Sequence, residues 1–195
     1  MKKIILSLVT VLTFGVSNAQ ETKEVEKKCS VKYGVKAGVN YDWLQPGDFS
    51  VKDFHPQVGF HVGLLAELQL CENFAVQPEL LYSQHSFINE PEGVPSAKLK
   101  ISEITLPVAF KFYLTKSFSL EVGPQVSMIM SGDNEGEDVK DKLRDYNVAA
   151  IFGLSYDFGK GVFVQVRNVY NFLDLQNTPE RNNFYGLQAS VGYKF

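Results

Sequence analysis

The chain has 195 residues, a formal net charge of −3 and 21% charged residues. This length suits one domain of ordinary size. The slightly acidic balance, without any basic patch or stripe, argues against nucleic acid as a partner.

Residues 1–19 have the pattern of a secretory signal peptide. Two lysines follow the first Met, and a mostly apolar run extends from Ile4 to Val16. Small residues, Ser17 and Ala19, then precede an expected cleavage before Gln20. The apolar run is shorter than the ~20 residues that a membrane-spanning helix needs. We therefore predict export and cleavage, which leaves residues 20–32 as an N-terminal segment on the periplasmic side.

From Tyr33 to the C-terminus, apolar residues alternate with polar or small ones in eight successive runs. The runs cover residues 33–43, 58–68, 74–83, 104–112, 118–128, 147–158, 162–172 and 187–195. Strict alternation with period two indicates half-buried β-strands rather than helices. Most runs are also longer than the ~5 or 6 residues that are common in soluble proteins.

The connections between these runs alternate between long and short. The long ones cover residues 44–56, 84–100, 131–145 and 174–182, and the short ones residues 71–73, 115–117 and 159–161. In an antiparallel arrangement, this order places every long loop at one end, as in bacterial outer-membrane barrels. The sequence therefore predicts an all-β fold over residues 33–195, an eight-stranded antiparallel up-and-down transmembrane β-barrel.

The apolar face of the runs is expected to meet lipid and the polar face to line the lumen. Aromatic residues gather at both ends of the apolar face, which is typical of the two interfacial girdles of a membrane barrel. The polar face carries three acids and three bases in mid-strand: Lys36, Glu67, Glu79, Lys111, Glu121 and Arg167. Because eight strands enclose little more than side chains and isolated buried charges are costly, we expect a paired network there.

Three prolines interrupt the pattern inside expected strands: Pro78, Pro107 and Pro124. Proline cannot donate a ladder hydrogen bond. We expect a β-bulge or a strand bend at each of them.

Several stretches resemble the small outer-membrane β-barrel proteins known as the porin family, or OmpA/OmpX-like proteins. They are V-Q-P-E-L-L-Y-S at residues 76–83, I-T-L-P-V-A-F-K-F-Y at 104–113, F-G-L-S-Y-D-F at 152–158 and the final Y-K-F. Arg167 matches an inward Arg of that family, whereas R-N-V-Y-N-F at residues 167–172 departs from the usual R-Y-x-Y-G-L.

This resemblance implies a place in the outer membrane of a Gram-negative envelope. Its implied partners are membrane lipid, including lipopolysaccharide, and the outer-membrane assembly machinery. That machinery would read the last strand, whose signal residues are Leu187, Ala189, Val191, Tyr193 and Phe195. We expect a monomer.

The two cysteines, Cys29 and Cys71, lie just before the first expected strand and in the first short connection. The barrel topology places both at the same rim. An even number of cysteines in an exported chain is compatible with one disulfide. We predict a Cys29–Cys71 disulfide, with two free thiols as the alternative.

Three functions remain open from the sequence. The favoured one is a barrel with a filled lumen that acts in envelope structure or surface interaction through its outer loops. The first alternative is a narrow passive pore. The more remote one is a lipid-modifying enzyme, in which His85 and Ser86 would be base and nucleophile, although neighbours on a strand point to opposite faces. The chain shows no metal or cofactor motif, so we expect neither a cofactor nor an enzyme.

Overall fold

The computed structural model describes residues 30–44, 54–89, 97–134, 137–138, 140, 145–172 and 184–195. The predicted signal peptide and residues 20–29 lie outside these ranges. The strands are β1 (Ser30–Leu44), β2 (Phe54–Pro56), β3 (Val58–Cys71), β4 (Phe74–Asn89), β5 (Ala97–Tyr113), β6 (Phe118–Asn134), β7 (Glu137–Asp138), β8 (Tyr146–Gly159), β9 (Val162–Asn171) and β10 (Phe184–Lys194). No described helix is long and apolar enough to cross a membrane.

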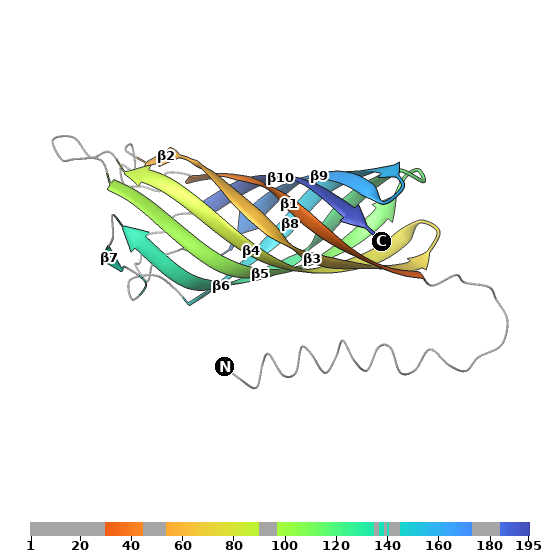
Figure 1. Ribbon diagram of the computed structural model, residues 1–195, viewed down its shortest axis with the longest axis horizontal. Helices are drawn as coiled ribbons and strands as arrows, with labels where there is room; N and C mark the ends of the chain where they lie inside the picture. The colour runs from red at the N-terminus through yellow and green to blue at the C-terminus, as the bar shows by residue number, and fades with distance from the viewer. Residues whose placement is uncertain are drawn as a thin grey trace, which may run out of the picture.

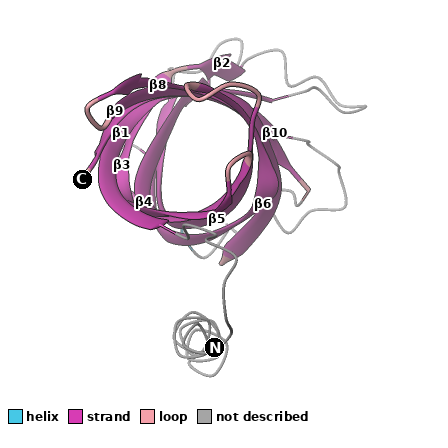
Figure 2. Cartoon of the chain, turned by 90° about the vertical axis from the view of Figure 1, so that its right-hand side faces the viewer, coloured by secondary structure: helices cyan, strands magenta, loops and turns pink. Residues whose placement is uncertain are grey.

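The strands form one closed antiparallel barrel (Figures 1 and 2). Neighbouring strands follow the order β4–β3–β1–β10–β9–β8–β6–β5, and pairing of β4 with β5 completes the ring. β2 and β7 are short additions that pair with the ends of β4 and β6. The eight remaining strands confirm the predicted eight-stranded up-and-down architecture.

Short turns and both ends of the barrel domain lie at one rim, which we call the short-turn end (Figure 1). The turn between β8 and β9 illustrates how the sequence builds this rim. Gly159, Lys160 and Gly161 all have positive φ angles, of 79°, 53° and 88°, and glycine adopts such angles without steric cost. The opposite rim, where the long connections emerge, is the long-loop end.

Several strands extend further toward the long-loop end than the alternation indicated. β4 continues to Asn89 and β5 begins at Ala97, so much of the expected 84–100 loop is strand. β1 is extended at its other end, because it begins at Ser30 on the short-turn side, before the first expected strand residue, Tyr33. The outward residues in the extended parts of β4 and β5 include Gln84, Ser86 and Lys100. The apolar pattern therefore stops at this height, although backbone pairing continues.

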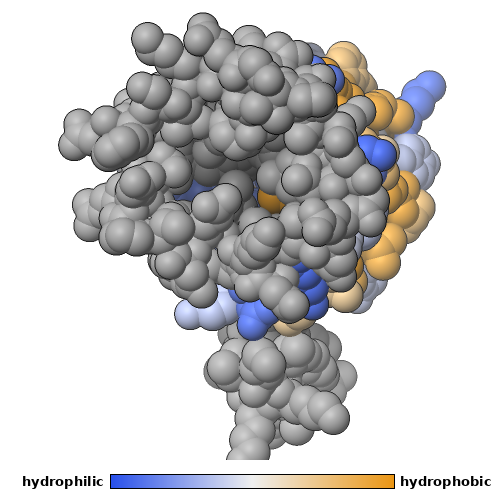
Figure 3. All heavy atoms as spheres, turned by 90° about the vertical axis from the view of Figure 1, so that its left-hand side faces the viewer, coloured by the Kyte–Doolittle hydropathy of each residue, from blue (hydrophilic) through white to orange (hydrophobic). Residues whose placement is uncertain are grey.

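The two faces of the barrel differ as expected. Outward residues are exposed and apolar, as Phe152 at 62% and Val191 at 56% illustrate, and apolar atoms cover the part of the outer wall that Figure 3 shows in orange. Inward residues are buried and mostly polar. A soluble barrel would bury the apolar set instead, so this distribution fits a lipid solvent outside.

No register shift marks a β-bulge at Pro78, Pro107 or Pro124 in the described strands, and the alternative, a strand bend, stays a prediction. Pro78 pairs with Val108 and Leu81 with Thr105 in one unchanged register, although the two β4 residues between them are unpaired with β5. The β5–β6 ladder also skips Val108 and Ala109 and keeps its register. A missing N–H removes a ladder bond, but the neighbouring pairs hold the strands in place.

Register shifts occur elsewhere. They lie between Gln69 and Cys71 in β3, between Ser102 and Glu103 in the β5–β6 pair, and between Asp157 and Gly159 in β8. The first and third adjoin short turns. Bulges at barrel rims are common, because they adjust the bend of a strand as it ends.

Candidate functional site

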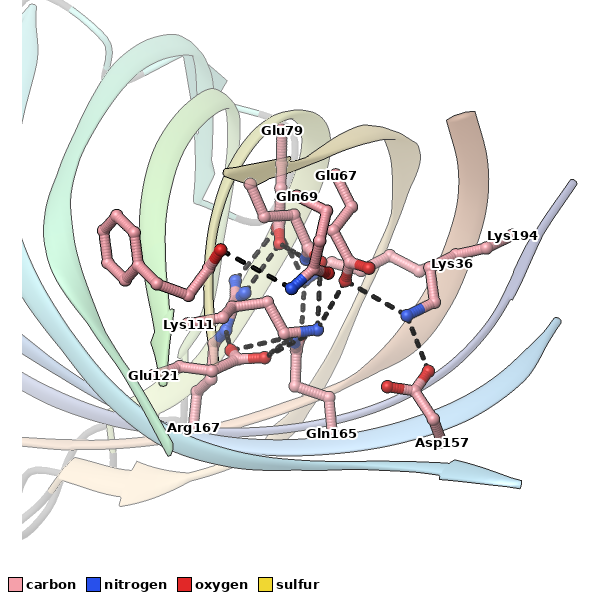
Figure 4. A network of polar contacts seen from close by, with 12 residues as sticks. Lys36, Glu67, Gln69, Glu79, Lys111, Glu121, Asp157, Gln165, Arg167 and Lys194 are labelled. Carbon is pink, nitrogen blue, oxygen red and sulfur yellow. Dashed lines mark hydrogen bonds and ion pairs between the residues drawn. The ribbon is translucent and has the colours of Figure 1, made fainter. Parts of the chain in front are cut away.

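The lumen nearer the short-turn end contains a network of ion pairs centred on Arg167 (Figure 4). The guanidinium Nη2 lies 2.6 Å from Glu79 Oε1, and Nη1 donates to Glu79 Oε2 at 2.9 Å. Its Nε lies 2.8 Å from Glu121 Oε2. Two parallel bonds to one carboxylate form a strong and geometrically specific pair. Arg167 therefore links β9 to β4 and β6 across the barrel.

Lysines extend this network around the ring. Lys36 Nζ lies 2.7 Å from Glu79 Oε2, and Lys111 Nζ lies 2.9 Å from Glu67 Oε2 and 3.6 Å from Glu121 Oε1. Glu79 and Glu121 thus each have two cationic neighbours, which compensate the loss of hydration of these carboxylates.

The end of β10 adds a further pair of charges. Lys194 Nζ lies 3.0 Å from Glu67 Oε2 and 2.6 Å from Asp157 Oδ1. The network then contains four bases and four acids, because these two join the six residues named from the sequence. The charges balance, as a stable buried network requires.

Neutral amides fill the spaces between the charges. Gln165 donates from Nε2 to both oxygens of Glu121 at 2.9 Å and accepts from Lys36 Nζ at 2.7 Å. Gln77 donates to Glu79 and accepts from Lys111. We call these ten residues the charge plug: Lys36, Glu67, Gln77, Glu79, Lys111, Glu121, Asp157, Gln165, Arg167 and Lys194.

Most of the charge plug is buried, although Asp157 at its edge is partly exposed. The six charges predicted from the sequence are all no more than 4% exposed. Side chains that line an open aqueous channel would be in contact with water along its length. This burial indicates that side chains fill the barrel cross-section at this height, which agrees with the narrow interior of eight-stranded barrels.

A second polar cluster lies nearer the long-loop end. His85 Nδ1 contacts Asp42 Oδ2, and its Nε2 lies 3.2 Å from Glu103 Oε1. Thr105 and Ser127 donate to the same Glu103 oxygen at 2.9 and 3.1 Å. Since both imidazole nitrogens face carboxylates, the doubly protonated imidazolium is the form that satisfies both contacts.

His61 forms a separate bridge inside the barrel. Its Nδ1 lies 2.7 Å from Asn40 Oδ1 and its Nε2 lies 2.8 Å from Ser190 Oγ. This histidine therefore connects β3 with β1 and β10. Among the described residues, no group of three or more His, Cys, Asp or Glu side chains has the arrangement of a metal site.

The structure brings all six predicted lumen charges into one network. Sequence reasoning missed the outer members of the plug, Asp157 and Lys194, and the whole cluster around His85. A signal was available for Asp42, Asp157 and Lys194, which occupy inward positions of the alternating runs, whereas His85 and Glu103 lie just outside those runs. They were overlooked because they stand near strand ends, where alternation alone does not separate lumen from loop.

The cysteine prediction lies partly outside the described residues. Cys71 ends β3 and is exposed, whereas Cys29 precedes the described part. Ser30, the residue after Cys29, pairs with Gln69, two residues before Cys71. Both cysteines are therefore close in sequence to residues that are paired at the same rim, and the disulfide stays a prediction.

We expect a Cys29–Cys71 cross-linked peptide in a non-reducing digest of freshly isolated protein, detected by mass spectrometry. Blocking thiols at lysis prevents oxidation during isolation and serves as the control. Recovery of both cysteines as separately alkylated peptides would exclude the disulfide.

The last strand closes the barrel between β1 and β9. Phe195 N donates to Tyr33 O at 2.8 Å, so pairing continues to the terminal residue. Tyr193 and Phe195 are exposed, at 45% and 71%. Recognition of this strand by the assembly machinery stays a prediction.

Comparisons with known proteins agree with this architecture. The family described as outer membrane protein beta-barrel domain matches residues 18–177. Neisserial surface protein A, from Neisseria, is 18% identical with a TM-score of 0.58, over 85% of this chain and 99% of that one. The attachment invasion locus protein Ail of Yersinia pestis, solved with the heparin analogue sucrose octasulfate, is 14% identical with a TM-score of 0.51, over 85% and 99%.

A search of curated proteins finds no match. At these identities, the two solved structures establish similarity of fold alone. The family match covers most of the chain and includes seven of the eight long strands completely. The chain therefore belongs to the outer membrane protein beta-barrel family.

Proposed function

We propose that this outer-membrane barrel acts in envelope structure or surface interaction, through the loops at its long-loop end. The charge plug is the observation that carries this proposal. Four acids and four bases are paired across the lumen, and Lys111 and Glu121, at its centre, are 0% exposed. A barrel filled in this way has no solvent path at that height, which leaves the rims and loops as its working surfaces.

The surrounding lipid, including lipopolysaccharide, is the partner that such a barrel meets first. We also propose that the signal peptide directs the chain to the periplasm and that the assembly machinery inserts it by way of the last strand. The exposed apolar wall supports a lipid partner, because residues such as Phe152 and Val191 would otherwise face water.

An enzymatic role has little support in the geometry. A general base needs an unprotonated nitrogen within reach of its nucleophile. Both ring nitrogens of His85 instead face carboxylates, on Asp42 and Glu103. His85 is therefore better described as part of a structural cluster than as a base for Ser86.

We expect refolded residues 20–195 to give no unitary conductance steps in planar lipid bilayers, because the plug closes the lumen. The same preparation should show the heat-dependent gel shift of a folded barrel. This control excludes misfolding as the reason for an absence of conductance. This measurement separates the proposal from the narrow-pore alternative.

Matched variants identify the conducting path if steps occur. Glu121→Gln changes a lumen charge, whereas Val122→Ala changes its outward neighbour, which is 44% exposed. Conductance steps whose ion selectivity changes in Glu121→Gln but not in Val122→Ala would show that ions pass through the lumen. That result would overturn the proposal.

A further inference from the structure

The lipid-facing wall of the barrel carries a polar residue where lipid offers no partner. Asn168 lies on β9 between two buried lumen residues, Arg167 and Val169, so its side chain is on the outward face. Its ladder partners, Leu187 on β10 and Phe152 on β8, are 40% and 62% exposed. Asn168 is therefore surrounded by the apolar band of the barrel.

The Asn168 amide has no hydrogen-bond partner among the described residues. The other outward residues described on β8, β9 and β10 are apolar or aromatic. An amide placed in hydrocarbon without a hydrogen-bond partner is unfavourable, because it loses its hydration without compensation. Lysine and arginine avoid this cost by extending their head groups to the membrane interface, but the asparagine side chain is too short.

Below the row of Asn168, the wall is made of valine and alanine side chains. Two cross-strand rows run over β1, β10 and β9, and they consist of Val39, Ala189 and Val166, and of Ala37, Val191 and Val164. All six are exposed. On the far side of Asn168, β8 carries the larger Phe152 and Leu154. Alanine lets two membrane-embedded surfaces approach closely, and polar side chains such as Asn bond across such a contact.

We propose that this face, with Asn168 beside the two rows of alanine and valine, is where two copies of the barrel associate side by side in the membrane. A primary amide has both a donor and an acceptor, so it is its own complement. A two-fold axis places the same surface of each copy against the other, and Asn168 near that axis meets its counterpart. In the dimer, the two Asn168 amides hydrogen-bond to each other. In the monomer, the same donor and acceptor have no partner in the hydrocarbon. Such a dimer differs from the monomer expected from the sequence, and its formation does not depend on what the loops bind.

Cysteine cross-linking in intact outer membranes tests the dimer. The full-length protein is expressed with Cys29 and Cys71 replaced by serine, and a single cysteine is introduced as Val166→Cys or Leu80→Cys. These two positions are equally exposed, at 48%, and β4 lies across the ring from β9. A membrane-permeable oxidant should give dimers from the Val166 variant at a yield well above that from the Leu80 control.

The role of the amide is tested by a second substitution in the Val166→Cys protein. Asn168→Val should raise the dimer dissociation constant about tenfold, as expected for two modest hydrogen bonds within a membrane. Asn168→Gln keeps the amide and should retain most of the cross-linking. Asn168→Val should also resist urea at least as well as the parent protein, because the substitution removes a polar group from lipid. A loss of cross-linking in this variant is then not caused by misfolding.

Two outcomes would overturn the proposal. One is equal cross-linking from the Val166 and Leu80 variants, which would indicate random collision. The other is a monomeric protein from which Asn168→Val removes co-purifying lipopolysaccharide, which would show that the amide bonds to a lipid hydroxyl instead.

Discussion

Replacing Arg167 by methionine is expected to lower the free energy of unfolding by about 3–5 kcal/mol, the usual cost of removing one partner from a buried ion pair. Methionine keeps much of the volume of the side-chain stem but removes the guanidinium. Glu79 then keeps Lys36, and Glu121 keeps Lys111 at 3.6 Å, so the plug holds one acid in excess. Urea unfolding of the protein in lipid vesicles, followed by tryptophan fluorescence, measures the loss.

A charge-balanced double variant provides the control. Adding Glu121→Gln to Arg167→Met leaves three acids and three bases in the plug. Glu79 still pairs with Lys36, and Lys111 still pairs with Glu67. The double variant should therefore be more stable than Arg167→Met alone. If the two losses simply add, the two side chains are not coupled and the paired-network description is wrong.

Replacing Gly153 by alanine is expected to cost about 1–3 kcal/mol, the range for overpacking a filled interior. A Cβ atom at Gly153 would lie 2.5 Å from the Val166 carbonyl oxygen and 2.7 Å from Arg167 Cγ. The carbonyl belongs to the backbone of the paired neighbour strand, and Arg167 is fixed by two carboxylates. Neither can move without disturbing the ladder or the plug, and the same urea titration measures the cost.

Ser155→Ala is the matched control on the same strand and the same inward face. Ser155 is 2% exposed, and its Oγ has no hydrogen-bond partner in the part of the chain that the structure describes. Removing an unsatisfied buried hydroxyl is close to neutral or slightly stabilising. An equal loss in Ser155→Ala and Gly153→Ala would show that any change on this face is harmful, and that the close approach at Gly153 is not the reason.

The contacts of Gly153 could suggest that every glycine facing the lumen makes room for a charged side chain. This does not hold for all of them. The sites of Gly34 and Gly63 lie against Leu65 and Leu81, and that of Gly192 against Phe163. These glycines accommodate apolar side chains and the backbone of neighbouring strands. Sequence alternation shows only that they face inward, because it contains no information on which long side chain crosses to meet them.

The fold and the division into lipid and lumen faces could be predicted because both follow from local, periodic properties. Side chains on a strand alternate between two faces, so the inward position of Lys36 or Arg167 can be determined from the strand alone. The order of long and short connections then orients the barrel. The effect of the prolines could not be predicted, because neighbouring ladder pairs on either side of Pro78 and Pro107 maintain the register.

The sequence by itself therefore determined the strands, their faces, the closed barrel and the six charges that face inward. Only the tertiary structure decided which charges meet. Arg167 binds Glu79, 88 residues away in the chain, and Lys194 reaches Glu67 across 127 residues. Such partners depend on the stagger of the strands around the closed ring, which sets the height of each residue in the lumen. That stagger is a property of the whole barrel, so no single strand encodes it.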